Sequence, residues 1–345
     1  MLCSGPTSRW ARLLPTAVAL VAFALVAGCA SSGQADGAAE PQSPTSAAAD
    51  PAAAGTATGA DTSTQVAPAV ATAAKKPTPA RLCVGAGYLD PNHSCPKSTK
   101  LLKTADFYKN DISKGITTKC LMIPPYPDQP LVCHAGDQTS PTKRIALVGN
   151  SHAGHWYEAM DAVGKKNHWA VDTYILAYCY VTLTEAPDYC ADFRAKESAA
   201  IMAAKYDLVV LASDQSPNAT PALYVPTIQA LVGNGSNVLT IRDTPAPLDP
   251  AHLVADCVAQ HLKSWSRCSG KPSKWIHPDP LTDAAKQLKS ADVFTVNLDK
   301  YICTKKACPA VVGGVIPYRD ENHLTVTFSK SLVPYLTPAV AKALS

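Results

Sequence analysis

Short aliphatic runs alternate with segments of helical period through the C-terminal two thirds of this 345-residue chain. Five runs predict buried strands, at residues 145–148, 169–176, 207–212, 237–241 and 293–298. Helical patterns start at Ser151 and cover 191–205, 221–232, 282–290 and 323–344, the last with bends expected at Pro334 and Pro338. Strands that alternate with helices form a parallel sheet covered on both faces. We therefore expect a three-layer α/β/α domain of flavodoxin-like type, with a parallel five-stranded sheet.

The first predicted strand turns into a helix across Gly149, Asn150 and Ser151. Ser151 therefore lies at the carboxyl end of a strand, which is the edge where open α/β sheets bind ligands. The helix start offers unpaired N–H groups and the positive end of the helix dipole. Ser151 is a candidate nucleophile whose backbone N–H contributes to an oxyanion hole. The alternative is that Ser151 is only a helix N-cap, a position that favours serine.

A second polar cluster near the C-terminus supplies what a nucleophilic serine needs. Asp320 precedes His323 by three residues, a spacing that lets the carboxylate hold one imidazole nitrogen while the other faces a serine. The alternative is a surface turn with a solvated aspartate and a histidine at a helix start.

Taken together, the segment 149–152 (Gly-Asn-Ser-His) and the pattern Asp320-x-x-His323 resemble the motifs of the SGNH/GDSL hydrolase superfamily. The resemblance is strongest to the extracytoplasmic SGNH domains fused to acyltransferase-3 membrane proteins, which modify cell-surface glycans. Segments 207–211, 241–245 and 308–314 are similar as well, so the resemblance covers roughly residues 143–345. It implies an SGNH hydrolase-like fold, with Ser151, Asp320 and His323 as the catalytic residues.

The chain departs from the superfamily pattern at several positions that line the expected site. Asn150 stands where the superfamily usually has aspartate. The usual oxyanion donors, a glycine after the second strand and an asparagine after the third, are missing, and Gln215 or a backbone N–H is the expected substitute. Only the backbone N–H of Ser151 is assigned as a donor, and a missing donor typically lowers the rate by 10²–10³.

Other polar residues near these motifs have two interpretations each. His152 and His155 flank the nucleophile as second bases, although the resemblance favours a position behind the turn for His152. Asp243 follows a strand and either meets substrate or forms a turn before a proline. Tyr318 and Arg319 border the base as candidate rim residues.

The N-terminus has the features of a bacterial lipoprotein signal. Arg9 and Arg12 precede an apolar stretch at 17–27 that is too short to span a membrane and ends in small residues. Residues 26–29 (Val-Ala-Gly-Cys) resemble a lipobox, which implies cleavage after residue 28 and a lipid on Cys29. The protein would then be extracytoplasmic and anchored in the cell membrane; the alternative is secretion, with Cys29 incidental.

Composition divides the rest of the chain. Residues 30–80 contain no aromatic residue, leucine or isoleucine, so they cannot bury enough apolar area to offset chain entropy. We interpret 29–80 as a disordered Ala/Pro/Ser/Thr-rich tether, 81–140 as a disulfide-bearing N-terminal extension and 141–345 as the SGNH domain.

Ten cysteines remain after the signal and Cys29 are set aside, and they fall in five close pairs. An even set in an exported protein implies disulfides. Neighbour pairing is the simplest assignment, with crossed pairs as the alternative: Cys83–Cys95, Cys120–Cys133, Cys179–Cys190, Cys257–Cys268 and Cys303–Cys308. The chain has no Cys-x-x-Cys and no histidines that accompany the pairs, so we expect no metal site.

Charge and glycine patterns exclude further classes of function. The formal charge of +4 is too small for a nucleic-acid surface, and no glycine-rich dinucleotide or phosphate loop follows a strand. We therefore expect no cofactor and no nucleic-acid partner.

The resemblance implies transfer of an acyl group, most simply acetyl, to or from a cell-envelope glycan through an acyl-serine intermediate. It also implies a membrane acyltransferase as the acyl donor. As a flexible coil the tether would span about 40 Å between its ends, so the domain could reach both a wall polymer and a membrane partner. The alternatives are a plain carbohydrate esterase and a non-catalytic glycan-binding lipoprotein on the same fold.

Overall fold

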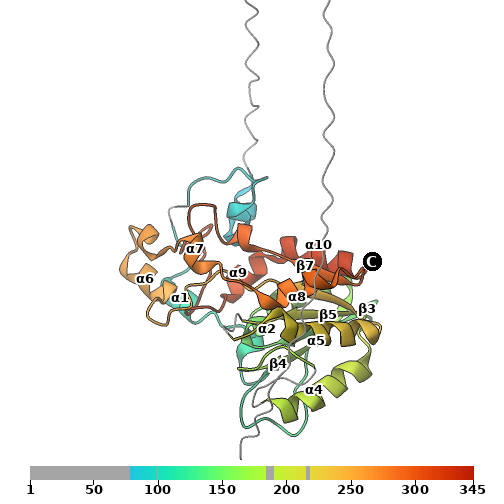
Figure 1. Cartoon of the computed structure of the whole chain (residues 1–345). Coiled ribbons are helices and arrows are strands. Elements are labelled where there is room, and N and C mark those ends of the chain that lie inside the picture. Colours follow the sequence, from blue (N-terminus) through green and yellow to red (C-terminus); the bar gives the residue numbers. More distant parts are fainter. Residues whose placement is uncertain (1–77, 99, 184–189, 215–217) are drawn as a thin grey trace, which may run out of the picture. The chain divides into compact units, whose positions relative to one another are not determined.

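A central sheet with helices on both faces organises the molecule (Figure 1). The computed structural model describes residues 78–98, 100–183, 190–214 and 218–345. The strands are β1 (Leu121–Met122), β2 (Cys133–Gly136), β3 (Lys143–Gly149), β4 (Trp169–Leu176), β5 (Leu208–Ala212), β6 (Asn237–Ile241) and β7 (Val293–Val296). The order across the sheet is β1-β4-β3-β5-β6-β7, and β2 also pairs with β4.

The five predicted strands are β3 to β7, and every pairing among them is parallel. Their spatial order, with the second strand outside the first and the others following on the opposite side, is the flavodoxin-like order. The chain leaves β3 toward β4 on one side and returns to β5 on the other. The crevice beyond the carboxyl end of β3 is therefore the topological switch point of the sheet, where ligands bind in such folds.

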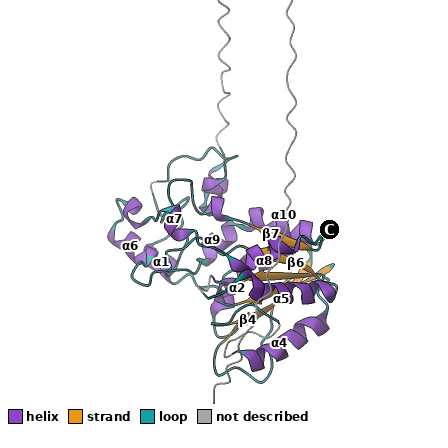
Figure 2. Ribbon diagram, in the orientation of Figure 1, coloured by secondary structure: helices purple, strands orange, loops and turns teal. Residues whose placement is uncertain are grey.

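Helices cover both faces of the sheet (Figure 2). They are α1 (Ala105–Lys109), α2 (Ser151–Gly154), α3 (Tyr157–Asn167), α4 (Ala191–Ala204), α5 (Pro221–Gly233), α6 (Val254–Gln260), α7 (Pro272–Trp275), α8 (Pro280–Leu288), α9 (Val326–Ser331) and α10 (Val333–Ala343). Five 3-10 helices connect them: η1 (Ala80–Cys83), η2 (Gly85–Leu89), η3 (Lys114–Ile116), η4 (Trp265–Cys268) and η5 (Asp299–Tyr301).

The three layers follow from the alternation of side chains along β3. Ile145 and Leu147 are fully buried in a cluster with residues of α3, α9 and α10. Ala146 and Val148 point the other way, into a cluster with residues of α4, α5 and α8. Because both faces are covered, the strand is a continuous aliphatic run rather than an alternation of apolar and polar residues.

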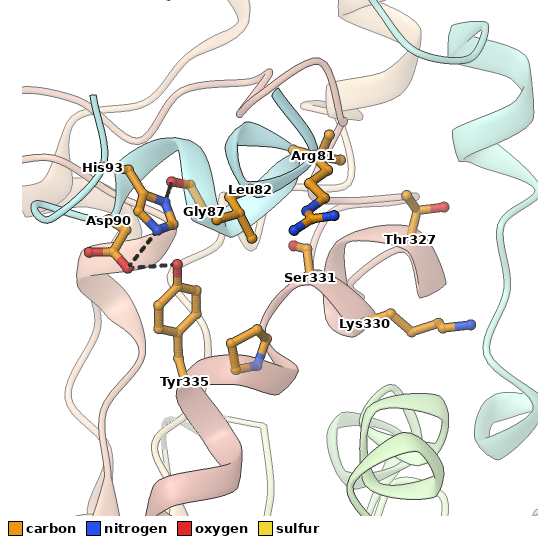
Figure 3. Close-up of a pocket in the computed structure, with 11 residues that line it drawn as sticks. Arg81, Leu82, Gly87, Asp90, His93, Thr327, Lys330, Ser331 and Tyr335 are labelled. Atoms are coloured by element: carbon orange, nitrogen blue, oxygen red, sulfur yellow. Dashed lines mark hydrogen bonds and ion pairs between the residues drawn. The ribbon is translucent and has the colours of Figure 1, made fainter. Parts of the chain in front are cut away.

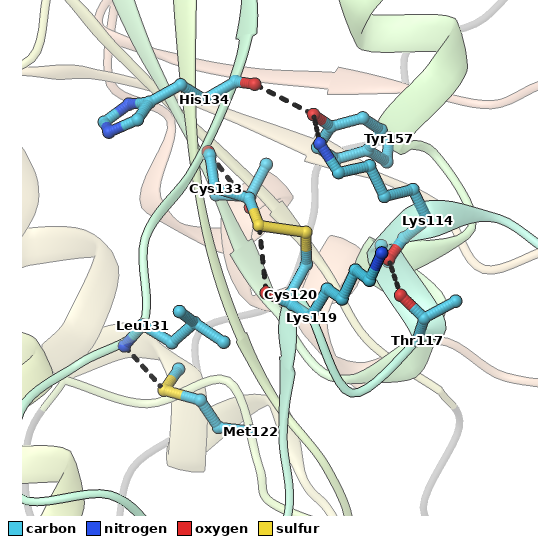
Figure 4. The surroundings of a disulfide bond; sticks show 12 residues. Lys114, Thr117, Lys119, Cys120, Met122, Leu131, Cys133, His134 and Tyr157 are labelled. Atoms are coloured by element: carbon cyan, nitrogen blue, oxygen red, sulfur yellow. Dashed lines mark hydrogen bonds between the residues drawn. A yellow bond between two sulfur atoms is a disulfide. The ribbon is translucent and has the colours of Figure 1, made fainter.

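The N-terminal extension contributes two further strands to the sheet, so the sheet has seven strands where the sequence predicted five. β1 pairs parallel with the carboxyl end of β4, and β2 pairs antiparallel with its amino half. The Cys120–Cys133 disulfide joins the residue before β1 to the first residue of β2 (Figure 4). The Tyr157 hydroxyl of α3 donates to the carbonyl oxygen of His134 at 2.8 Å, which fixes β2 to the helix layer.

The predicted closing helix over 323–344 is wrong at its start and in its continuity. The helix begins only after Thr325, whose hydroxyl accepts from the Phe328 N–H at 3.2 Å as an N-cap. It ends at Ser331, and α10 starts anew at Val333 with Pro334 in its first turn, where the missing N–H has no cost. His323 therefore lies in a turn ahead of α9. The helix predicted from Ser151 is likewise two helices, α2 and α3.

Residues Ala71–Ser345 form one compact unit. It contains five disulfides, which join the same neighbours that the sequence suggested: Cys83–Cys95, Cys120–Cys133, Cys179–Cys190, Cys257–Cys268 and Cys303–Cys308. A chain that starts at residue 71 thus keeps all of the described core and cross-links. Within the described ranges, no helix is both long and apolar enough to cross a membrane. The signal segment, Cys29 and most of the predicted tether lie outside the described residues.

Candidate active site

The turn between β3 and α2 presents Ser151 at the switch point of the sheet. Gly149 has a φ of 155°, and a Cβ there would overlap the carbonyl oxygen of Ala212 on β5, so only glycine fits between the two strands. The next residue, Asn150, is the N-cap of α2, because its Oδ1 accepts from the His152 N–H at 3.0 Å. The alternative that Ser151 is the N-cap is therefore wrong. Ser151 is the first residue of the helix, and its side chain has no capping role.

Asn150 also connects this turn to the loop after β5. Its Nδ2 donates to the Ser213 hydroxyl at 3.0 Å and to a carboxylate oxygen of Asp214. Its Oδ1 accepts from the Asp214 N–H at 3.2 Å. An aspartate at position 150 would keep the accepted hydrogen bonds but place a second carboxylate against Asp214. The amide at position 150 is therefore the electrostatic complement of Asp214, which explains this departure from the superfamily pattern.

The backbone of α2 leaves the Ser151 N–H available. The amides of Ala153 and Gly154 donate to the Asn150 carbonyl oxygen, and that of His152 donates to the Asn150 side chain. In the described part of the chain, the Ser151 N–H is the one amide of α2 without an acceptor. It is therefore free to donate to an oxygen of a bound substrate.

Two serine hydroxyls hold the far end of α2. Ser113 donates to the Gly154 carbonyl oxygen at 2.7 Å, and Ser329 of α9 donates to the His155 carbonyl oxygen at 2.9 Å. Both hydroxyls are buried, so these bonds satisfy carbonyl groups that the short helix leaves without partners. The extension and the C-terminal helix thus fix the position of the turn that carries Ser151.

Asp320 and His323 form a hydrogen-bonded pair within one turn. Asp320 Oδ2 lies 2.9 Å from His323 Nδ1, and Oδ1 accepts from the His323 N–H at 2.7 Å. Arg319 approaches the same carboxylate, with its Nη2 2.9 Å from Oδ2. Burial opposes ionisation, but the hydrogen bond from His323 and the charges of His323 and Arg319 lower the pKa of Asp320 to about 2. Because an ionised carboxylate can only accept, His323 Nδ1 is the donor and its Nε2 carries the lone pair when the ring is neutral.

His152 pairs with Asp243 behind this turn, deeper in the protein. His152 Nδ1 lies 2.6 Å from Asp243 Oδ1, and the two side chains are 2% and 1% exposed. Burial disfavours the cation, but the Asp243 carboxylate and its hydrogen bond raise the pKa of His152 to about 9. His155 is neutral, because burial and the charge of His152 lower its pKa well below the ordinary value. His152 is therefore a buried cation, as its predicted position behind the turn allows, and not a base exposed to substrate.

The structure brings the two predicted motifs to the same place. The His323 ring centroid lies 5.1 Å from that of His152, the residue directly after Ser151, and 6.5 Å from that of His155. His323 Nε2 is buried and has no hydrogen-bond partner among the residues described. The lone-pair nitrogen of the candidate base is thus uncommitted, and its ring lies next to the turn that carries the candidate nucleophile.

Other candidates take different places. Asp243 faces His152 inside the protein, and its backbone N–H donates to Asp279 at 2.8 Å. Of the two candidate rim residues, Tyr318 is fully buried against Trp275 and is therefore not on the rim. Gln215 lies outside the described residues. Asp214 was missed; its place directly after a buried strand was the signal that could have identified it.

A cavity of about 430 Å³ lies between the N-terminal 3-10 helices and helices α9 and α10 (Figure 3). Its wall includes Arg81, Lys330 and Tyr335, and the Tyr335 hydroxyl donates to Asp90 at 2.9 Å. Neither Ser151 nor His323 is among its lining residues. The cavity is therefore separate from the candidate catalytic groups.

One group of side chains has the spacing of a metal site, with ligand atoms of Cys257, His261 and Cys268 within 4.8 Å of one another. The two sulfurs form a disulfide, however, and cannot act as thiolate ligands. These residues do not fit a metal ion.

A family model described as an SGNH domain, fused to AT3 domains, matches residues 119–338. Several solved structures are similar to the chain, among them the following three. The periplasmic domain of a lipopolysaccharide acetyltransferase from Salmonella ser. Paratyphi A is 12% identical, with a TM-score of 0.45, over 59% of this chain and 85% of that domain. A GDSL-like lipase from Bacteroides thetaiotaomicron is 15% identical, with a TM-score of 0.36, over 59% of this chain and 92% of the lipase.

The third is the C-terminal catalytic domain of peptidoglycan O-acetyltransferase A from Streptococcus pneumoniae, solved with a methylsulfonyl adduct. It is 12% identical, with a TM-score of 0.29, over 61% of this chain and 95% of that domain. No curated protein matches the chain.

Proposed function

The chain belongs to the family of SGNH domains that are fused to AT3 domains, and from this premise we propose that it transfers an acyl group to a cell-envelope glycan. The acyl group, most simply acetyl, passes through an ester on Ser151. One observation carries the proposal: the Asp320–His323 pair, with Nε2 uncommitted, lies against the turn that carries Ser151.

Each residue of this trio has a distinct role. The Ser151 hydroxyl attacks the acyl carbonyl carbon while His323 Nε2 accepts the hydroxyl proton. Asp320 remains ionised, fixes the tautomer of His323 and stabilises the imidazolium that forms. When the tetrahedral intermediate collapses, the proton on Nε2 goes to the leaving group of the donor. A glycan hydroxyl then attacks the acyl-serine, its proton passes to Nε2, and the Ser151 hydroxyl is released with that proton.

The oxyanion of the tetrahedral intermediate accepts a hydrogen bond from the Ser151 N–H, which no carbonyl group occupies in the described residues. The buried His152–Asp243 pair lies behind the same turn and fixes the residue that follows Ser151. His152 and Asp243 thus support the site from inside the protein without contact with substrate.

The direction of the reaction depends on which nucleophile reaches the acyl-enzyme. A sugar hydroxyl gives transfer, and water gives ester hydrolysis. Family membership favours transfer, because SGNH domains of this family are fused to AT3 domains, to which the acyl-donor role is assigned in this proposal. We propose a membrane acyltransferase as the acyl donor and a lipid on Cys29 as the membrane anchor. Residues 29–80 would be the tether between that anchor and the domain.

Hydrolysis of a chromogenic acetyl ester tests the catalytic assignment. Wild type is expected to hydrolyse the ester, Ser151→Ala to lose activity, and Asp320→Asn to lose about 10²-fold or more, because the base then loses its orienting carboxylate. A Ser151→Ala variant as active as wild type would overturn the assignment. Saccharide binding without any esterase activity in wild type would instead support a glycan-binding protein.

Product analysis separates transfer from hydrolysis. The enzyme is supplied with an activated acetyl donor, with and without a saccharide acceptor. Transfer predicts an acylated sugar and less free acetate when acceptor is present. Equal acetate release in both reactions, with no acylated sugar, would identify an esterase.

A further inference from the structure

A surface patch formed by segments 97–103 and 262–267, outside the catalytic motifs, combines exposed leucines with lysines. Leu262 is its centre, because it lines three adjoining hollows of the surface. One of these also contains Leu102 and Lys103, another Lys97 and Lys263, and the third Arg267. We call this set the basic–apolar patch: Lys97, Leu102, Lys103, Leu262, Lys263 and Arg267.

The two leucines are held in exposed positions. Leu262 is 60% exposed and Leu102 is 53% exposed. Leu262 lies in a loop closed by the Cys257–Cys268 disulfide, and the Leu102 backbone N–H donates to the Gly314 carbonyl oxygen at 2.9 Å. Helices α1 and α6 beside them lie together (Figure 1) and are joined by Lys109 and Asp256, whose Nζ and Oδ1 are 2.8 Å apart. Both leucines are therefore exposed on backbone that a cross-link or a hydrogen bond holds to the rest of the domain.

The patch is also positively charged. Residues 78–345 contain 27 lysines and arginines and 23 aspartates and glutamates, an excess of four positive charges. The patch contributes four cations, and Asp106 is the acidic residue among those that line its hollows. None of the four cations is paired with a carboxylate in the described ranges. The lining of the patch thus has four cations against one carboxylate around the two exposed leucines.

We propose that the basic–apolar patch rests on the surface of an anionic lipid bilayer. The leucines would enter the boundary between headgroups and acyl chains, and the lysines and Arg267 would meet lipid phosphates. An acidic polymer in water would engage the cations but would give the leucines no favourable environment, so the combination favours a membrane.

The point where the N-terminal segment enters the domain supports this orientation. The Thr78 N–H donates to the Ser94 carbonyl oxygen at 3.2 Å, and the Ser94 N–H donates to the Thr78 hydroxyl at 2.7 Å. Ser94 precedes Lys97 by three residues, so their Cα atoms lie at most about 11 Å apart. The preceding 77 residues therefore join the domain close to Lys97, so their point of attachment lies on the same side of the domain as the basic–apolar patch. The proposal does not depend on the catalytic assignment.

Vesicle sedimentation of residues 71–345 tests the proposal, because this unit lacks the signal segment and any lipid. Wild type is expected to bind vesicles of equal parts phosphatidylglycerol and phosphatidylcholine, and to bind phosphatidylcholine alone at least tenfold more weakly. Lys103→Glu with Lys263→Glu should weaken binding to anionic vesicles by roughly tenfold or more, since each cation near such a surface contributes appreciably. Leu102→Ser with Leu262→Ser should also weaken it by roughly tenfold.

The matched control is Lys166→Glu with Lys205→Glu, two exposed lysines at the amino end of the sheet, which should leave binding unchanged. Thermal melting of each variant verifies that it is folded. Failure of wild type to bind anionic vesicles would overturn the proposal. Binding that the leucine pair does not affect and that a soluble polyphosphate abolishes would also overturn it, and would identify an acidic polymer as the partner.

Discussion

Asn150 links the nucleophile turn to the loop after β5 through a side-chain amide that both donates and accepts. Replacement by aspartate removes only the hydrogen bonds that the Asn150 side chain donates. The backbone N–H groups of His152 and Asp214 can still donate to a carboxylate oxygen. Asn150→Asp should therefore destabilise the protein by about 2–3 kcal/mol, through repulsion between two carboxylates in a largely buried pair.

Exchange of the pair provides the control. Asn150→Asp with Asp214→Asn restores one amide and one carboxylate, so it should recover most of the loss in a double-mutant cycle measured by urea unfolding. Additive losses in the two single variants would show that the pair does not interact.

The His152–Asp243 pair makes stability depend on pH. The pKa of His152 in the folded protein is raised to about 9 from an ordinary value of 6.5. Because the pKa of His152 is raised on folding, the pair contributes its full stabilisation of the folded protein at pH values below 6.5. This contribution is lost as the pH rises through 9. The free energy of unfolding should thus fall by about 3 kcal/mol between pH 6.5 and pH 9.5.

Asp243→Asn removes the charge that holds this proton. The variant should be less stable than wild type at pH 6.5 and should lose the pH-dependent difference, as urea titrations at the two pH values would show. Parallel pH profiles for wild type and variant would contradict the assignment of a cationic His152.

At the scale of elements, predictability from sequence follows burial. Strands β3 to β7, most of them buried in the sheet, were all predicted: β4 and β6 have the predicted ends, and the ends of β3, β5 and β7 differ from the predicted ones by one or two residues. Strands β1 and β2 were missed: Leu121–Met122 is too short to show a pattern, and Cys133–Gly136 has no apolar run. Their place in the sheet depends on the partner β4 and on a disulfide, and neither is a local property.

The disulfide that closes β1 onto β2 should stabilise this edge of the sheet. Cys120→Ser with Cys133→Ser opens a loop of 13 residues and should destabilise the protein by about 3 kcal/mol in the chain-entropy model. Limited proteolysis should then cut between residues 123 and 132. The matched variant Cys303→Ser with Cys308→Ser opens a loop of only five residues and should leave that segment uncut. Cleavage there in both variants would mean that the strands do not depend on their own cross-link.

The candidate site shows the limit of sequence reasoning most clearly. Ser151, Asp320 and His323 could be selected from two short motifs, because strand-to-helix turns and Asp-x-x-His spacing are local. The partners that hold them, Ser113, Asp214 and Ser329, come from three distant segments. Only the fold brings such residues together. Of the three, Asp214 alone has a local signal, its place just after the buried strand β5.

At the scale of the whole molecule, the proposed function assigns the location of the domain to its N-terminal segment. If Cys29 carries a lipid, Cys29→Ser should move the protein from the membrane fraction to the medium, because an unmodified chain has no acyl anchor. Fractionation of expressing cells with an antibody to the domain measures this. The basic–apolar patch alone would give salt-sensitive binding, so a high-salt wash separates the two contributions. A Cys29→Ser variant that stays in the membrane fraction after that wash would contradict lipidation.

The acyl-serine intermediate is the central element of the proposed function, and a serine-reactive fluorophosphonate tests it most directly. Peptide mapping of labelled wild type should place the probe on the peptide that contains Ser151. Ser151→Ala should remain unlabelled, and His323→Ala should react at least about 10²-fold more slowly, because no base then accepts the hydroxyl proton. Labelling of Ser151→Ala at the wild-type rate, or no labelling of folded wild type, would contradict a nucleophilic Ser151.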